Sequence, residues 1–485
     1  MAKIADGGEV MNWITVVGLE IHAQMATQTK MFCACRREAG AEANLHICPV
    51  CVGWPGALPV LQSEAVRCAI RAALCLGCEI QELSRFDRKN YFYPDLPKGY
   101  QISQFYKPYA LGGGIPFIRD DQSAATLPLV RIHMEEDAGK SSHESDGTSR
   151  IDLNRCSSPL LEIVTEPMMM SSTEAASCVR SVRNLLRWVD VCDGDMEKGN
   201  LRCDVNVSVM PEGAKEYGTR TELKNLNSFV SIERSIVVES ARQIELLAAG
   251  GTIRQETRLW DQDKEITESM RGKEDSPDYR YFPEPDLPAI SISNAEIQTQ
   301  RESLPEMPEV RELRWLEEYK FQEREIVPLM ARRANGDFLE SMVSEGVAPT
   351  DASNWFRGEI LRYLNERSEK IESFPVSTKS MARLILATKE DLFSVGRAKS
   401  LLQEALEAES SLDHLIDQAG SQVQDEGELA GWVDQVLSEN PEAVTKIQAG
   451  DEKPMGFLMG QVMRLSSGQA HPRKVQELIK DRLAN

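Results

Sequence analysis

Alternating hydrophobic and polar residues dominate the first part of the chain. In residues 15–24, Leu19 and Ile21 point to one side of an extended segment, whereas Glu20 and His22 point to the other. This period of two predicts a strand with one packed face and one face that carries a carboxylate and an imidazole.

Two further segments repeat this pattern. Residues 160–166 place Glu162 and Glu166 on one face, and residues 201–209 alternate Leu201, Cys203, Val205 and Val207 with a polar set: Arg202, Asp204, Asn206 and Ser208. A single strand of this kind indicates only a solvated sheet face. Three such strands favour a shared polar surface that performs chemistry.

The pattern changes along the chain. It is rich in turns and strands from residue 13 to 281, with helices expected near 63–76, 172–189 and 231–249. Five prolines then fall between 283 and 308, where continued helix is disfavoured. The later sequence is helical. We predict an α+β fold in which a mainly antiparallel sheet domain with flanking helices (1–290) precedes two all-helical domains, 291–395 and 396–485.

The segment from 131 to 140 contains three consecutive acids. Strict alternation aligns Glu135 with His133 but places Glu136 beside Ile132 and Met134, where a buried acid needs a cation. Carboxylates, a histidine and an asparagine together suit Mg²⁺ with nucleotide phosphates. An acidic turn that ends at Gly139 is the alternative interpretation.

Four cysteines form the most specific motif. Cys33 and Cys35 are followed, after twelve residues, by Cys48 and Cys51. Two close thiolate pairs match the tetrahedral ligand set of structural Zn²⁺, and four sulfur ligands leave no open position for substrate. His46 is an alternative fourth ligand. Buried free thiols are the competing interpretation.

Composition and charge limit the function classes. The formal net charge is −21, which disfavours nonspecific attraction to nucleic acid. Residues 453–485 nevertheless hold six bases and two acids, whereas residues 401–452 hold 13 acids and one base. No apolar run is long enough for a signal peptide or a membrane span, and the number of cysteines is odd. We expect a cytoplasmic protein without a membrane anchor.

The common nucleotide motifs are missing. The sequence has no Walker A motif, no dinucleotide fingerprint, no kinase signature set and no G-x-S-x-G elbow. A protein of this sequence that uses ATP would therefore bind it on an uncommon fold.

Several long segments, taken in order, carry a resemblance to one family. They are VGLEIHAQM (17–25), FDRKNYFYPDLPKGYQISQ (86–104), HMEEDAGKS (133–141), DLNRCSSPLLEIVTEP (152–167), GNLRCDVNVSV (199–209), TELKNLNSF (221–229), QETRLWD (255–261), DYRYFPEPDLP (278–288) and KPMGFLMGQVMRLSSGQAHP (453–472). Together they resemble the B subunit of the tRNA-dependent aspartyl/glutamyl-tRNA(Asn/Gln) amidotransferase. The resemblance covers nearly the entire chain.

The resemblance implies a function. In that family the protein binds misacylated Glu-tRNA(Gln) or Asp-tRNA(Asn) and phosphorylates the side-chain carboxylate with ATP and Mg²⁺. Ammonia that an amidase A subunit releases from glutamine travels through a channel and displaces the phosphate. A small C subunit completes the heterotrimer. A structural zinc knuckle occurs in part of the family.

The resemblance also implies site residues. The expected catalytic residues are Glu20, His22, Glu136 and Glu162, of which His22, Glu136 and Glu162 would bind Mg²⁺. Second choices are Glu135, Asp137, Asp204 and Asn206. Residues expected to contact ATP or the tRNA terminus are Lys89, Arg202, Asp204, Asn206, Lys224 and Arg280. In the tail, the residues expected to contact tRNA are Lys453, Arg464, Arg473 and Lys474. Surface ion pairing is the alternative for each cation singly.

Two other functions compete with this expectation. One is a noncatalytic, zinc-stapled scaffold that presents tRNA to another enzyme, but such a scaffold has no use for several carboxylates that face one cavity. The other is an independent ATP-dependent ligase or kinase, which the missing nucleotide motifs disfavour.

Overall fold

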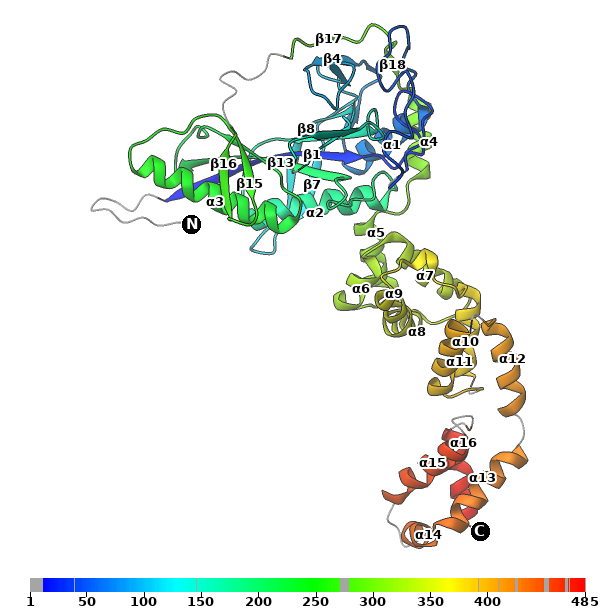
Figure 1. Ribbon diagram of the computed structural model, residues 1–485. Coiled ribbons are helices and arrows are strands. Elements are labelled where there is room, and N and C mark those ends of the chain that lie inside the picture. Colours follow the sequence, from blue (N-terminus) through cyan, green and yellow to red (C-terminus); the bar gives the residue numbers. More distant parts are fainter. Residues whose placement is uncertain are drawn as a thin grey trace. The chain divides into compact units, whose positions relative to one another are not determined.

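The computed structural model describes residues 12–270 and 279–484, apart from 39, 145, 391, 409, 424–425, 449–452, 467–469 and 471. Its contacts divide the chain into two units, Met1–Met307 and Pro308–Asn485. The first unit is built around sheets and the second is helical (Figure 1). The predicted α+β class is therefore confirmed, while the two units join at Met307 and Pro308 rather than at residue 290.

One large sheet forms the centre of the first unit. It has 11 strands, in the order β16-β15-β14-β13-β1-β11-β8-β6-β2, with β12 paired to β1 and β7 paired to β8. Only β14 and β15 pair in parallel among the described strands of this sheet. The strands are β1 (Trp13–Gln24), β2 (Glu79–Ile80), β6 (Ala110–Leu111), β7 (Gly114–Ile118), β8 (Ala124–Glu136), β11 (Pro159–Thr165), β12 (Met168–Met169), β13 (Leu201–Pro211), β14 (Thr221–Lys224), β15 (Thr257–Asp261) and β16 (Ile266–Ser269).

Three small sheets accompany the large one. Their strands are β3 (Leu83–Ser84) with β18 (Ile290–Ser291), β9 (Lys140–His143) with β10 (Ser149–Asp152), and β17 (Phe282–Pro283) with β4 (Asp87–Asn90) and β5 (Tyr100–Ser103). The β17-β4-β5 sheet brings the segment after residue 278 beside residues 87–103, although they are far apart in sequence.

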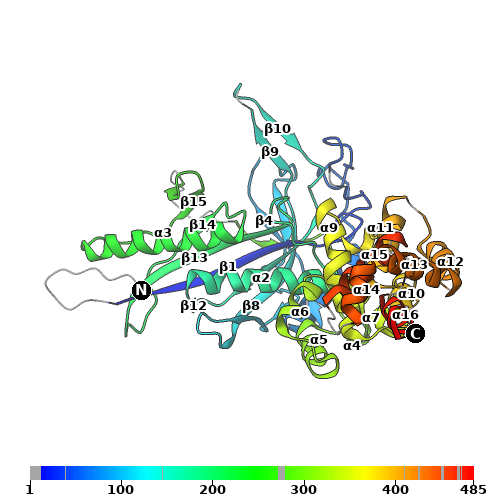
Figure 2. The same ribbon diagram turned by 90° about the horizontal axis from the view of Figure 1, so that it is seen from below.

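Helices α2 (Ser172–Trp188) and α3 (Phe229–Ala248) cover one face of the large sheet (Figures 1 and 2). Burial of the β1 residues Val17, Leu19 and Ile21 is nearly complete, and the hydroxyl of Thr15 on the same face lies 3.3 Å from the hydroxyl of Ser240 in α3. The polar residues that alternate with them face away from these helices. The unit also contains α1 (Ser63–Cys75) and α4 (Asn294–Ser303).

The second unit consists of short helices. They are α5 (Pro308–Arg314), η1 (Trp315–Tyr319), α6 (Glu323–Met330), α7 (Arg333–Ser344), α8 (Pro349–Trp355), η2 (Phe356–Ile360), α9 (Leu361–Arg367), η3 (Ile371–Ser373), α10 (Thr378–Lys389), α11 (Val395–Glu407), α12 (Leu412–Val423), α13 (Glu426–Glu439), α14 (Pro441–Gln448), α15 (Lys453–Leu465) and α16 (Pro472–Ala484).

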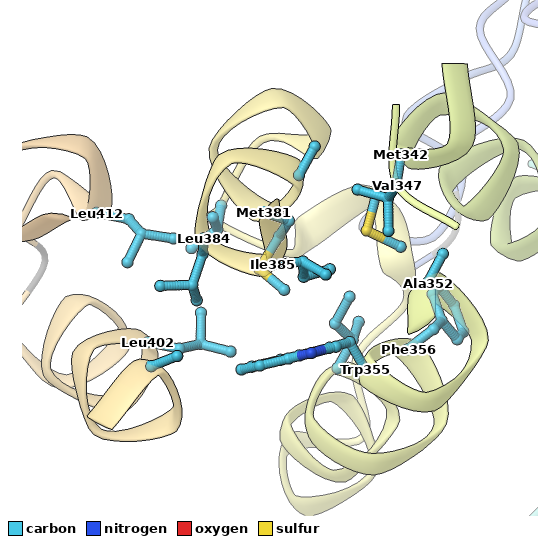
Figure 3. Packing of buried hydrophobic residues seen from close by; sticks show 14 of the residues in the cluster. Met342, Val347, Ala352, Trp355, Phe356, Met381, Leu384, Ile385, Leu402 and Leu412 are labelled. Atoms are coloured by element: carbon cyan, nitrogen blue, oxygen red, sulfur yellow. The ribbon is translucent and has the colours of Figure 1, made fainter. Parts of the chain in front are cut away.

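Two hydrophobic cores hold these helices. The first runs from Trp315 to Ala419 along the sequence, and Figure 3 shows Trp355 packed among residues of α10 and α11 such as Ile385 and Leu402. The second runs from residue 433 to 479. The predicted division at residue 395 thus differs from the packing, because α11 begins there and buries its leucines in the first core. In the described part of the chain, no helix is long and apolar enough to cross a bilayer.

Candidate functional site

The registers of four strands assemble the polar face of the sheet. His22 of β1 stands opposite Glu162 of β11 on one side and Arg202 of β13 on the other. Glu162 in turn stands opposite His133 of β8. Because each of these residues alternates with buried apolar neighbours, their side chains share the face that α2 and α3 leave uncovered.

His22, Glu135 and Glu162 form what we call the His–Glu cluster. Their ligand atoms all lie within 4.8 Å of one another, and the Nε2 of His22 is 3.6 Å from Glu162 and 3.8 Å from Glu135. His133 joins from the same strand as Glu135, with its Nε2 3.0 Å from Glu162. Two carboxylates and one imidazole are a donor set that suits a divalent cation.

The pKa values show how strongly these groups interact. Burial raises the pKa of Glu162, but the charges and hydrogen bonds of His133 and His22 outweigh burial and hold it well below its ordinary value. Burial lowers the pKa of His133, whereas Glu162 and Glu135 raise it to about 9. Burial, followed by the charge of Glu162, raises the pKa of Glu20. The positive charge of the imidazoles therefore stabilises the carboxylate of Glu162 at this place.

Glu136, which is predicted to bind Mg²⁺ together with His22 and Glu162, lies apart from the cluster. It is 1% exposed, forms an ion pair with Lys98, and accepts hydrogen bonds from the backbone N–H of Ile102 at 2.9 Å and the hydroxyl of Ser157 at 2.7 Å. A shift of one residue along a strand moves a side chain to the opposite face. Glu135, a second choice on the sequence, therefore takes the place expected for Glu136.

From the cluster, a row of polar side chains continues across β13 to β14, and we call it the polar row. The amide of Asn206 donates to Glu20 at 2.9 Å, and the ammonium of Lys224 lies 2.5 Å from Asp204 and 2.8 Å from Glu222. Two of the residues expected to contact ATP or tRNA, Asn206 and Lys224, are thus engaged with acidic neighbours on the same face, and Asp204 is one of those neighbours.

Arg202 and Asp137 occupy the end of the row near the Cys-rich segment. The guanidinium of Arg202 donates to Asp137 at 3.0 Å, and Gln24 donates to the same carboxylate at 2.8 Å. Burial raises the pKa of Asp137, but the charge of Arg202 outweighs it and the pKa is lowered. Asp137 therefore holds Arg202 at the edge of the His–Glu cluster.

Two further predicted cations come from outside the large sheet. The ammonium of Lys89 lies 4.9 Å from the ring centroid of Tyr279. Burial lowers its pKa, but the charges of Glu135 and other neighbours outweigh burial and raise it. Arg280 is exposed and has a φ of 44°. Lys89 is thus the cation whose charge acts on the cluster.

Two residues that contact the predicted glutamates, His133 and Lys98, were not predicted as site residues from the sequence. His133 shares a strand face with Glu135, so the alternation of β8 already indicated its position. Lys98 had a weaker signal, namely that an acid among apolar neighbours requires a cation. Its place beside Glu136 depends on the loop between β4 and β5, which no local pattern predicts.

The four cysteines form a second cluster. The Sγ atoms of Cys33, Cys35, Cys48 and Cys51 all lie within 4.8 Å of one another, a grouping compatible with structural zinc. A hydrogen bond between Cys33 and Cys51 lowers the pKa of the Cys51 thiol to about 4. His46, the alternative ligand, is paired with Glu38 at 3.2 Å instead.

The predicted tRNA-binding residues belong to α15 and α16. Lys453, Arg464 and Lys474 are exposed on these helices. The side chain of Arg473 falls outside the described residues.

Two family models match the chain. A family model described as the GatB/GatE catalytic domain matches residues 15–298. A model described as the GatB domain matches residues 337–483. The first match contains the His–Glu cluster and the four cysteines, and the second contains α15 and most of α16.

Individual relatives match over nearly their whole length. The chain is 44% identical over 476 residues to the B subunit of the aspartyl/glutamyl-tRNA(Asn/Gln) amidotransferase of Alkalilimnicola ehrlichii, covering 98% of this chain and 100% of the relative. The proteins of the same name from Halorhodospira halophila and Persephonella marina are also 44% identical, with 98% of this chain and 99% and 100% of the relatives covered. The chain therefore belongs to the family of aspartyl/glutamyl-tRNA(Asn/Gln) amidotransferase B subunits.

Proposed function

We propose that this protein binds misacylated Glu-tRNA(Gln), Asp-tRNA(Asn) or both, and converts the side-chain carboxylate of the attached amino acid to an amide. The observation that carries the proposal is the His–Glu cluster on the open face of the sheet. ATP, Mg²⁺ and ammonia are the other reactants. The proposed partners are an amidase A subunit, which makes ammonia from glutamine, and a small C subunit, in a cytoplasmic heterotrimer.

The residues fit a bound Mg²⁺. His22, Glu135 and Glu162 would hold it, and the position of their ligand atoms within 4.8 Å of one another supports this assignment. Mg²⁺ neutralises the charge that develops on a transferred phosphoryl group. Glu20 lies on the same face two residues from His22, close enough to orient water or ammonia beside the reacting carboxyl group.

The chain's own cations position the anionic reactants. Lys89 carries a charge close to Glu135 and Glu162, and it would bind phosphate oxygens of ATP there. A carboxylate oxygen of the aminoacyl group attacks the terminal phosphorus, the bond to ADP breaks, and an acyl phosphate forms. Ammonia then attacks the carbonyl carbon and a C–N bond forms. The nitrogen loses a proton, the C–O bond to the phosphoryl group breaks, and inorganic phosphate leaves.

The polar row supports delivery of ammonia to this point. Asn206, Glu20, Asp204 and Lys224 are linked side by side from β14 to β1. Hydrogen-bonding groups of this kind keep a small polar molecule solvated as it moves along the face. The A subunit would feed ammonia into the row.

The four cysteines would hold a structural Zn²⁺. A site with four sulfur ligands is closed to substrate, and these cysteines are separate from the His–Glu cluster in the sequence and in their ligand atoms. Zinc would therefore stabilise the segment from 33 to 51 without taking part in the reaction.

The helical unit would bind the tRNA body. Exposed Lys453, Arg464 and Lys474 on α15 and α16 offer charges to phosphates, and the shape of an RNA rather than its base sequence would be recognised. A noncatalytic tRNA-binding scaffold remains the second candidate function, and the pair of carboxylates in the His–Glu cluster disfavours it.

A reconstituted reaction tests the proposal. The purified chain is combined with its A and C subunits, glutamine, ATP, Mg²⁺ and either Glu-tRNA(Gln) or Asp-tRNA(Asn), and the amidated aminoacyl-tRNA is measured. We expect activity with at least one substrate and its loss in the double variant Glu135→Gln, Glu162→Gln. Full activity of that variant would refute the proposed site. A wild-type chain that binds tRNA but gives no amide in the complete mixture would favour the scaffold.

A further inference from the structure

A chain of six aromatic rings borders the His–Glu cluster. Residues 91–106 and the distant segment 279–281 supply them, and neighbouring ring centroids lie 4.1 to 6.4 Å apart in this order: Tyr106, Phe105, Tyr281, Tyr279, Tyr91 and Tyr93. Phe105 and Tyr281 are stacked, with an interplanar angle of 12°. Neither the cysteine site nor the polar row uses these rings.

The rings at one end of this aromatic chain are exposed to solvent. Phe105 and Tyr106 are 41% and 55% exposed. Their backbone N–H groups both donate to the carboxylate of Asp87, at 3.0 and 2.9 Å, and Asp87 itself is fully buried. A buried anchor therefore fixes two exposed rings in place. Exposed apolar surface that is rigidly presented is typical of a binding site.

Cations lie beside the rings. The guanidinium of Arg131 is 5.9 Å from the ring centroid of Phe105, and the ammonium of Lys89 is 4.9 Å from that of Tyr279. Rings that stack a flat base next to cations that bind phosphate are the combination that nucleotides require. An apolar peptide or lipid would gain nothing from these charges.

The middle of the ring chain connects to the cluster. Lys89 interacts electrostatically with both Glu135 and Glu162, and so does Tyr281. A nucleotide whose base lies at Phe105 would thus have its charged end directed toward Lys89 and the His–Glu cluster. This direction is the one that phosphoryl transfer at the cluster demands.

We propose that Phe105 and Tyr106 form a stacking platform for adenine, with Lys89 and Arg131 binding the attached phosphates. This inference rests on the proposed function and names the part of the substrate that the aromatic chain takes. Adenine has two sources in that reaction, ATP and the 3′-terminal adenosine of tRNA. Stacking on an aromatic ring recognises either one.

Binding measurements on the full chain separate the two sources. In the first arm, the affinities of Mg²⁺–ATP and Mg²⁺–tripolyphosphate are compared by titration calorimetry. In the second, an acceptor-stem RNA that ends in CCA is compared with the same RNA ending in CCC. Phe105→Leu and Tyr106→Leu remove the flat ring and keep an apolar side chain. The control is Tyr217→Leu, since Tyr217 is 51% exposed and is not one of the six rings.

We expect the two variants to weaken binding of the adenine-containing ligand about ten-fold in one arm, with the ligand that lacks adenine and the control variant unchanged. A response to ATP assigns the platform to ATP, and a response to the CCA end assigns it to tRNA. If both variants keep the wild-type affinity in both arms, the platform is refuted. An active wild-type complex would in that case leave the proposed function standing, whereas a wild-type chain that binds neither adenine ligand overturns both proposals.

Discussion

The carboxylates of Glu135 and Glu136, consecutive residues of β8, point to opposite faces of the sheet. Glu135 approaches His22 to 3.8 Å, whereas Glu136 accepts hydrogen bonds from Ile102 and Ser157 and pairs with Lys98. One peptide unit thus separates a group proposed to bind metal from a group that holds the fold together.

Exchanging each glutamate for glutamine should separate these roles. Glu135→Gln removes a proposed metal ligand, so we expect kcat to fall about 100-fold or more with little change in urea stability. Glu136→Gln leaves the largely buried Lys98 without its counter-charge, and we expect it to lower the free energy of unfolding by about 3 kcal/mol. Steady-state kinetics and urea unfolding of both variants check this. The reverse pattern would contradict the assignment of the two faces.

Much of the polar face of the sheet could be predicted from the alternation within single strands. The alternation of β1 placed Glu20 and His22 together, and the same rule applied to β8 placed Glu135 beside His133. The same rule places Glu136 on the other face, whereas the resemblance implies Glu136 as the metal ligand. Strand register could not be predicted, because the pairing of His22 with Glu162 depends on contacts between segments about 140 residues apart.

The aromatic chain shows the same limit. Tyr91, Phe105 and Tyr281 lie in segments whose local pattern indicates only turns and short strands. The β17-β4-β5 sheet brings them together, and its strands are too short to give a periodic signal. The division of the helical unit into two cores could not be predicted from the sequence either. Helix α11 has the amphipathic pattern of any surface helix, and only its packing partners show which core it joins.

Loss of zinc should affect stability more than chemistry. Gly53, two residues after Cys51, packs closely on Lys98: a Cβ added to Gly53 would lie 2.5 Å from the Cγ of Lys98. The segment that contains the four cysteines therefore packs against this lysine. Cys51→Ser removes one of the four proposed zinc ligands, so it should reduce the zinc content and lower the thermal midpoint by several degrees. Zinc content, thermal unfolding and kcat at low temperature are the measurements. A variant that is folded at its usual midpoint yet inactive would indicate a catalytic metal instead.

The carboxylate of Glu239 should stabilise the sheet unit in a pH-dependent way. Burial raises its pKa, but hydrogen bonds from Arg242 and Gln243, among others, outweigh burial and hold the pKa below its ordinary 4.5. A group with a lowered folded pKa contributes stability that is present above the unfolded pKa and is lost as the pH falls through the folded one.

Glu239→Gln should accordingly lower the free energy of unfolding at pH 7 by about 2–3 kcal/mol. The difference from wild type should shrink as the pH falls below about 4.5. Urea unfolding across this pH range measures it, with Glu245→Gln as the control on the exposed face of the same helix. A pH-independent difference would show that the hydrogen bonds, rather than the charge, stabilise this position.

The basic tail, residues 453–485, should contribute affinity for tRNA and nothing to the chemical step. Arg464 and Lys474 are exposed on α15 and α16, so Arg464→Gln and Lys474→Gln should each raise the KM for aminoacyl-tRNA several-fold and leave kcat unchanged. Each lost phosphate contact should also reduce the slope of log affinity against log salt by about one.

Lys370→Gln is the matched control. Lys370 is an exposed cation of the same unit and precedes the acidic residues 401–452. If all three variants weaken binding equally, the helical unit attracts tRNA through its overall field. If none does, the tail does not contact tRNA and the polar face of the sheet unit must supply the affinity.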